Sequence, residues 1–155
     1  MSDDAKTEAA SPAAAPTDLQ KRLHEARQRK IARDQAAQEE VERHELAVLE
    51  LEEKLEAEGL GRCGTDFIVV DGGAEGPIGI KLGPSLLYTR FQAAMAGGKD
   101  PRPEDVFAYV FPCVCYPKPD AFKALNEKRP HLTMRCANAL TVLFGAKEDT
   151  TRSKH

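Results

Sequence analysis

Four cysteines occur in the sequence, and two of them, Cys113 and Cys115, flank a single valine in the stretch FPCVCYPKP. With His131 and Cys136 they form the series C-x-C-x15-H-x4-C, and thiolate and imidazole groups are ligands that zinc prefers. Structural zinc sites usually take paired ligands from a C-x2–4-C turn, so one intervening residue fits this chemistry poorly. Cys136 also falls on the apolar side of an expected helix, where a free cysteine behaves as a small hydrophobic residue. We therefore predict no metal and no cofactor, and keep a small zinc-binding regulator as an alternative.

Catalytic chemistry has little support elsewhere in the sequence. A redox pair usually has the form C-x-x-C at a helix N-terminus, where the helix dipole lowers the thiol pKa. The two neighbouring cysteines lie in an apolar run instead. The sequence also contains no G-x-S-x-G, H-E-x-x-H or P-loop motif. We predict that the protein is not an enzyme and that its function lies in its surfaces.

The composition allows one modest domain with appendages, because the chain has 155 residues. Aromatic residues make up only 6% and tryptophan is absent, which predicts a small aliphatic core. A formal net charge of -3 argues against general nucleic-acid binding. No apolar run is long enough to span a membrane, and the N-terminus has no signal-peptide pattern. We expect a cytoplasmic protein with reduced cysteines that binds neither nucleic acid nor membrane.

A long helix is the main feature of the N-terminal half. Thr17 and Gln20 have the spacing of a capping box, and no proline or glycine interrupts residues 18–58. Gly59 is the expected stop. One part of this helix follows a coiled-coil rhythm and a second part is a shorter apolar patch, but basic and acidic residues break the seam between them. The first part comprises Val41, His44, Val48, Leu51 and Leu55, and the second comprises Leu19, Leu23 and Ala26. Coiled-coil pairing and a solvated helix docked at one end both remain open.

Charge is segregated along this helix. Residues 17–33 contain six Lys/Arg against two acids, whereas residues 34–58 contain ten Asp/Glu against two Lys/Arg. This order opposes the helix dipole, which favours acids at the N-terminus and bases at the C-terminus. The pattern suits antiparallel association or an acidic partner, and a purely solvated surface is the competing interpretation.

The sequence of the C-terminal half predicts a β-hairpin followed by helices. Two β-rich runs, 65–70 and 77–82, flank the turn sequence DGGAEG. A helix then begins with Ser85 as its expected N-cap. Further helices are expected at 120–128 and 131–145, the last ending at Gly145. The run PEDVFAYVFPCVCYP has helical spacing with a kink at its internal proline, although it also suits a strand. The fold class is therefore mainly α with a small β-hairpin (α+β).

The expected organisation has four parts. They are a disordered N-terminal segment (1–16), a long charged helix (17–59), a hairpin-plus-helices domain (62–145) and a polar tail (146–155).

The C-terminal half resembles the tail assembly chaperones of tailed bacteriophages, over about residues 63–145. In that family an apolar run ends in a proline–aspartate turn, followed by a Phe/Leu-rich helix, a proline and a helix of Ala-Asn-Ala-Leu character that is closed by glycine. The matching positions here are 110–116, Pro119-Asp120, Phe122 and Leu125, Pro130, 137–140 and 143–145. Pro84, Ser85, Tyr88 and Phe91 match the preceding proline and aromatic-bearing helix. The long charged helix departs from the compact family pattern.

The resemblance implies a non-enzymatic function in the cytoplasm of an infected bacterium. Such chaperones bind the helical tape-measure protein, keep its apolar surface soluble, help recruit tail-tube subunits, and leave before the tail matures. The candidate groove-lining residues are Tyr88, Phe91, Phe107, Val110, Phe111 and Phe122, with burial in the core as the competing interpretation of each. The alternative function is a structural virion or adaptor protein that forms homo-oligomers through the 18–58 helix.

Overall fold

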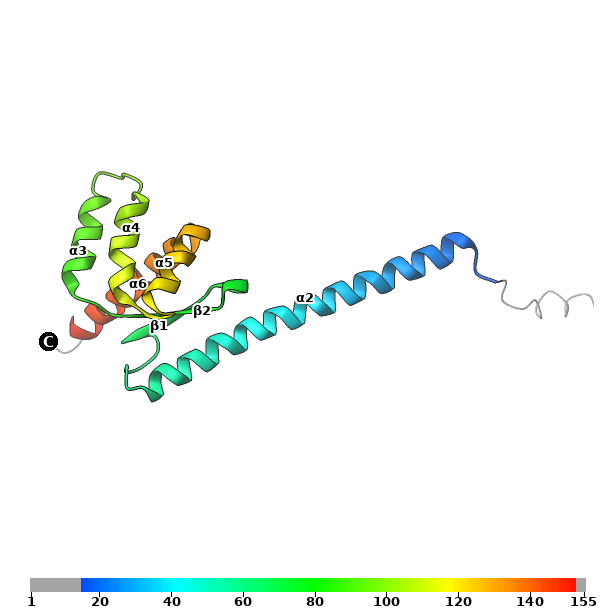
Figure 1. The fold of residues 1–155 in the computed structure, drawn as a ribbon, viewed down its shortest axis with the longest axis horizontal. Helices are drawn as coiled ribbons and strands as arrows, with labels where there is room; N and C mark the ends of the chain where they lie inside the picture. Colours follow the sequence, from blue (N-terminus) through cyan, green and yellow to red (C-terminus); the bar gives the residue numbers. More distant parts are fainter. Residues whose placement is uncertain (1–14, 153–155) are drawn as a thin grey trace, which may run out of the picture. The chain divides into compact units, whose positions relative to one another are not determined.

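The computed structural model describes residues 15–152, and side chains up to residue 148. The described residues are mainly helical and contain one small antiparallel sheet, as the sequence predicts. The expected disorder of residues 1–16 lies largely outside the described residues. The chain divides into two units, residues 1–41 and 42–155, and the second unit contains the sheet and its helices (Figure 1). The elements in chain order are α2 (Asp18–Ala57), β1 (Phe67–Asp71), η1 (Gly73–Glu75), β2 (Pro77–Lys81), α3 (Ser85–Ala94), α4 (Pro103–Val110), η2 (Phe111–Cys113), β3 (Val114–Tyr116), α5 (Pro119–Lys128) and α6 (Pro130–Arg152).

The long helix α2 begins and ends with the capping signals in its sequence. The backbone N–H of Thr17 donates to Gln20 Oε1 at 2.9 Å, and the N–H of Gln20 donates to Thr17 Oγ1 at 3.2 Å. This reciprocal pair is the predicted capping box. At the other end Gly59 has φ 85°, its N–H donates to Glu56 O, and the N–H of Leu60 donates to Leu55 O. These bonds form a Schellman motif, which explains why the helix stops there.

The three strands form an antiparallel sheet in the order β1-β2-β3. In the hairpin Val69 lies opposite Gly79, and both predicted strands are confirmed. The sheet is covered on both faces, because alternate residues of β1 enter different apolar clusters. Phe67 and Val69 pack with Leu51 and Leu55 from the end of α2. The other face packs against the helical layer, which explains why β1 is apolar at four successive positions.

The FPCVCYP segment is only partly helical. Helix α4 ends at Val110, a single 3-10 turn follows, and Val114–Tyr116 pair with β2 as strand β3. The predicted helix through Pro112 is therefore wrong beyond Val110, and the strand interpretation holds for the final residues. Pro112 has no backbone N–H to donate to a preceding turn, so the helix is not propagated through it.

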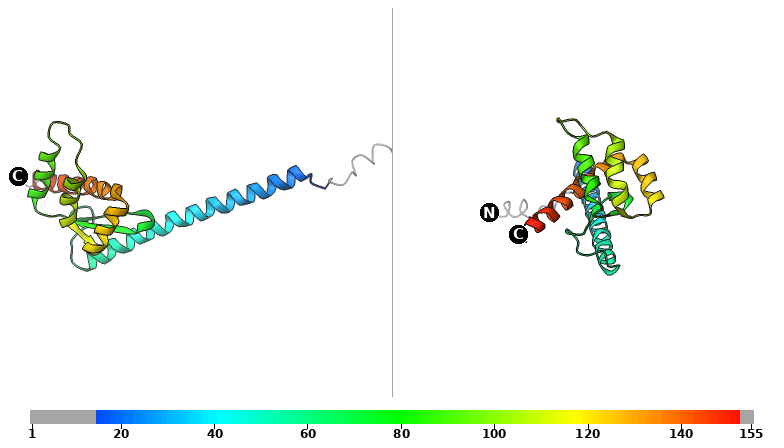
Figure 2. Two further views of the ribbon diagram at one scale, coloured as in Figure 1. Left: turned by 45° about the horizontal axis from the view of Figure 1, so that its top comes forward. Right: turned by 90° about the vertical axis from the view of Figure 1, so that its left-hand side faces the viewer.

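The helical layer contains most of the core. Helices α3 and α4 lie side by side, and α5 and α6 pack beside them (Figure 2). Fully buried side chains at its centre are Val110, Cys113, Phe122, Cys136 and Leu140. Helix α3 begins at Ser85, with Pro84 at the N-cap and no side-chain capping bond. Ser85 is therefore the first helical residue instead of the predicted cap.

Helix α6 continues to Arg152 and does not end at Gly145. The prediction that Gly145 is the stop, with a tail from residue 146, is wrong up to residue 152. Gly145 is not among the glycines with positive φ, and a glycine inside a helix costs only about 1 kcal/mol relative to alanine. The following Ala-Lys-Glu sequence favours helix, so propagation continues.

Gly145→Ala is expected to stabilise the protein by about 0.5–1 kcal/mol, because alanine is the better helix former. A Cβ at this position meets no atom within 4 Å. Urea unfolding followed by circular dichroism measures the change. A lower unfolding midpoint for the variant would contradict a helical Gly145.

Candidate partner-binding site

The cysteines are packing residues in the structure. Cys113 and Cys136 are 0% exposed, and burial raises the pKa of Cys113 to about 11 and that of Cys136 to about 12. Both thiols are therefore protonated near neutral pH, where a thiol is a poor nucleophile and a poor zinc ligand. His131 is exposed in the first turn of α6. Within residues 15–148 no group of three or more His, Cys, Asp or Glu side chains is arranged to hold a metal ion.

Aromatic side chains form two groups in the helical layer. In the first, Tyr88 stacks on Phe144 at 5.3 Å between ring centroids, Tyr109 follows at 6.3 Å from Phe144, and Phe91 stacks on Tyr109 at 4.2 Å. This series joins α3, α4 and α6. In the second group Phe107 lies 4.9 Å from Phe111 and 6.2 Å from Phe122.

The six predicted groove residues are divided between core and surface. Val110 and Phe122 are 0% exposed and Phe91 is 6% exposed, so these three belong to the core. Tyr88, Phe107 and Phe111 are half-buried at the edge of the core. The structure does not gather the six into one groove, because Val110 is fully buried and the five aromatic residues belong to the two separate aromatic groups.

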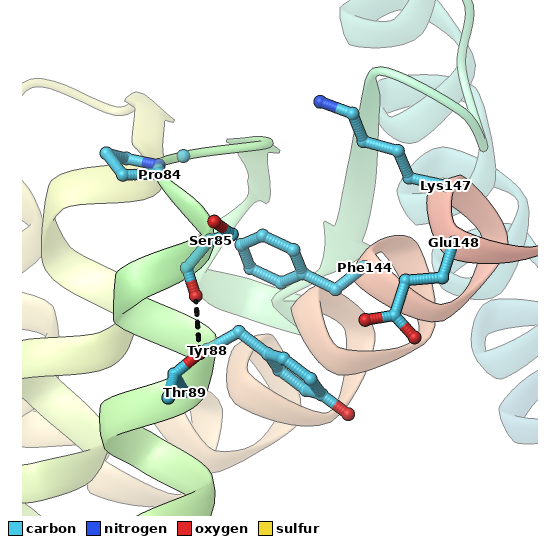
Figure 3. Close-up of a pocket in the computed structure, with 8 residues that line it drawn as sticks. Pro84, Ser85, Tyr88, Thr89, Phe144, Lys147 and Glu148 are labelled. Carbon is cyan, nitrogen blue, oxygen red and sulfur yellow. Dashed lines mark hydrogen bonds between the residues drawn. The ribbon is translucent and has the colours of Figure 1, made fainter. Parts of the chain in front are cut away.

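Tyr88 lines an open hollow of about 550 Å³ between the start of α3 and the C-terminal part of α6. Figure 3 shows the rings of Tyr88 and Phe144 between the two helices, with Lys147 and Glu148 on the α6 side. The Thr89 hydroxyl donates to the Ser85 carbonyl at 3.2 Å, so its proton is already used within α3. The lining residues are Gly83, Pro84, Ser85, Tyr88, Thr89, Phe144, Lys147 and Glu148. We call this feature the Tyr88–Phe144 hollow.

A close backbone approach positions the α3 side of the hollow. A Cβ built on Gly83 would lie 2.7 Å from Cys113 Sγ and 3.2 Å from Leu87 Cδ1. Glycine therefore lets the chain pass directly over η2 before Pro84 turns it into α3. One function of the buried Cys113 thiol is to fill the space beneath this turn.

A partly buried hydroxyl pair joins α4 to α6. Thr141 Oγ1 donates to the Ala137 carbonyl at 2.9 Å and lies 3.1 Å from the Tyr109 hydroxyl. Because the Thr141 proton is used in the first bond, the Tyr109 hydroxyl is the donor in the second. This bond fixes the Tyr109 ring, which in turn lies against Phe144.

Gly83→Ala is expected to lower the free energy of unfolding by about 1–3 kcal/mol, because it overpacks the contact with Cys113. Removing the sulfur should relieve part of this strain. In a Cys113→Ala background the same glycine substitution should therefore cost clearly less, and a double-mutant cycle by urea unfolding measures the difference. Equal costs in both backgrounds would show that the contact is not tight.

The hollow includes residues that sequence reasoning missed. Lys147 and Glu148 contribute to it because α6 continues through Gly145, and Phe144 contributes from the end of the helix that the sequence predicts. The available signal was the helix-forming composition after Gly145, together with the spacing of four residues between Leu140 and Phe144.

Comparisons with known proteins give no relative. No protein-family model, no curated protein and no solved structure matches the chain. No described helix is both long enough and apolar enough to cross a membrane.

Proposed function

We propose that the protein is a non-enzymatic assembly chaperone of the phage-tail type. In this proposal it binds an apolar segment of the tape-measure protein in the cytoplasm of the infected host and helps to bring tail-tube subunits to it. The Tyr88–Phe144 hollow is the observation that carries the proposal, because the half-buried Tyr88 ring, stacked on the buried Phe144 ring, lies beside an opening with a charged edge. The resemblance in residues 63–145 supports the same function.

The chemistry of the hollow suits an amphipathic helix better than a small polar substrate. Its volume lies within the range of about 300–1,000 Å³ that is typical of binding pockets. An amphipathic helix inserts side chains spaced three or four residues apart into such apolar hollows. The exposed Lys147 and Glu148 at the edge suit polar residues that flank the inserted side chains.

A small contact of this kind also suits a chaperone that must leave. Interfaces that bury little surface bind weakly, and several weak contacts along a long helical partner allow binding and later displacement. Tail-tube subunits that polymerise around the tape-measure protein would displace the chaperone by competing for the same apolar side chains.

Co-expression with the tape-measure protein from the same genome tests the proposal. We expect a larger soluble fraction of the tape-measure protein when the chaperone is present. We also expect mass spectrometry of purified virions to detect no stoichiometric copy of this chain. Stoichiometric incorporation into virions would overturn the chaperone function and favour the structural adaptor.

A further inference from the structure

Four large apolar side chains are exposed along one side of α2. The exposed fractions are 47% for Leu23, 49% for Ile31, 58% for Val41 and 48% for Leu49. At 3.6 residues per turn these four residues lie within one stripe of the helix surface. Between them, four polar residues occupy the same stripe. Together the stripe comprises Leu23, Arg27, Ile31, Asp34, Gln38, Val41, Glu45 and Leu49, and we call it the α2 seam.

The spacing of the residues in the α2 seam is symmetric about position 36, which Ala36 occupies. Its successive spacings are four, four, three, four, three, four and four residues. Leu23 and Leu49 each lie 13 residues from Ala36, and Ile31 and Val41 each lie five residues from it. Such symmetry is what a two-fold antiparallel pair of identical helices requires, because each residue meets the one at equal distance beyond the axis.

The chemistry of the paired positions is also complementary. In an antiparallel pair centred at Ala36, Leu23 meets Leu49 of the second copy and Ile31 meets Val41, so the apolar residues contact one another. Arg27 meets Glu45, both nine residues from the centre, and Asp34 meets Gln38, both two residues from it. No position in this arrangement places an apolar side chain opposite a charge.

Charge also selects the antiparallel direction over the parallel one. Residues 17–33 carry six basic and two acidic side chains, and residues 34–58 carry two basic and ten acidic ones. A parallel pair would place like charges together along both halves, whereas an antiparallel pair places each basic half against an acidic half. In the antiparallel direction the positive end of each helix dipole also lies near the negative end of the other, which is favourable.

The α2 seam is distinct from the side of α2 that packs on the sheet. Leu51 and Leu55 are 5% and 3% exposed against Phe67 and Val69. Leu49 precedes Leu51 by two residues and therefore points to nearly the opposite side of the helix. Leu49 therefore stays exposed although the end of α2 docks on the sheet.

We propose that α2 mediates an antiparallel, two-fold symmetric dimer of this chain through the α2 seam, with the symmetry axis at Ala36. Two Arg27–Glu45 pairs set the register, and the apolar layers on either side stabilise it. No seam residue lines the Tyr88–Phe144 hollow. The dimer can therefore be tested independently of partner binding in that hollow.

Charge reversal in the full-length chain tests the dimer. Analytical ultracentrifugation over a concentration series should show a monomer–dimer equilibrium that weakens as salt is added. Arg27→Glu and Glu45→Arg should each raise the dissociation constant at least tenfold by placing like charges together. The double variant Arg27→Glu/Glu45→Arg should return the dissociation constant toward the wild-type value. In this variant both pairs again join an acidic to a basic side chain, with the two positions exchanged.

Arg29→Glu is the matched control, because it makes the same charge change about half a turn away from Arg27. It should change the dissociation constant much less than Arg27→Glu does. Circular dichroism verifies that each variant keeps its helix. A wild-type chain that is monomeric at all concentrations, or a dimer that Arg27→Glu and Arg29→Glu weaken equally, would overturn the proposal.

The direction of pairing has its own readout. Chains carrying Leu23→Cys and Leu49→Cys are mixed and oxidised with oxidised glutathione, and the linked peptides are identified by mass spectrometry. Antiparallel pairing predicts a disulfide between positions 23 and 49 of different chains. Preferential 23–23 and 49–49 linkage would indicate a parallel pair and would overturn the proposal.

Discussion

Phe122→Ala is expected to lower the free energy of unfolding by about 3–5 kcal/mol, the usual cost of removing a buried phenylalanine ring. Phe122 is 0% exposed and lies 6.2 Å from the Phe107 ring and 6.4 Å from the Phe111 ring. Its removal leaves a cavity at the junction of α4, η2 and α5. Urea or thermal unfolding measures the loss. A residue that lined an open groove would show a much smaller effect.

Phe111→Ala is the matched control in the same aromatic group. Phe111 is half-buried, and the Lys123 ammonium lies 5.2 Å from its ring centroid. Its truncation therefore removes fewer buried contacts and should cost clearly less than truncation of Phe122. Similar small losses for both variants would contradict the core position of Phe122 and return it to the candidate groove.

Stability is expected to fall steeply as the pH rises above about 9, because two buried thiols resist ionisation. An unfolded cysteine loses its proton near its ordinary pKa of 9.0, whereas burial raises the pKa of Cys113 to about 11 and that of Cys136 to about 12. Between these values the unfolded state binds fewer protons than the folded state, so stability decreases with pH. Each thiol contributes up to about 1.4 kcal/mol per pH unit in this window.

Cys136→Ala separates this effect from general alkaline damage. The variant starts from lower stability at pH 7 because it loses buried volume. Its free energy of unfolding should nevertheless fall less steeply than that of the wild type between pH 9 and 11, since one titrating thiol is gone. Urea unfolding at a series of pH values measures both slopes. Parallel slopes would show that Cys136 ionises equally easily in the folded and unfolded states.

Local signals in the sequence predict much of the fold. The capping box of Thr17 and Gln20 and the glycine at 59 define both ends of α2 within a residue. The hairpin follows from two β-rich runs around a glycine-rich turn. These features depend on contacts between residues a few positions apart, so short stretches of sequence contain the relevant information.

Two features of the structure depend on more than local sequence. They are the end of α6 and the choice of which apolar side chains face the core. Glycine at position 145 is typical of a helix stop, yet the favourable helix formers after it continue α6. The six candidate groove residues depend on the same kind of information, because an apolar helical stripe has the same spacing whether it faces a core or a partner. Phe122 and Tyr88 illustrate the two outcomes: one is fully buried and the other lines the hollow.

Isothermal titration of a purified tape-measure segment into the full-length chain tests the proposed function most directly. Thr89→Arg places a long charged side chain in the Tyr88–Phe144 hollow, whereas Gln92→Arg makes the same addition at an exposed position of α3 that does not line it. We predict that Thr89→Arg weakens binding at least tenfold and that Gln92→Arg leaves the affinity near that of the wild type. Wild-type affinity for both variants, or no binding by the wild-type chain, would contradict the account.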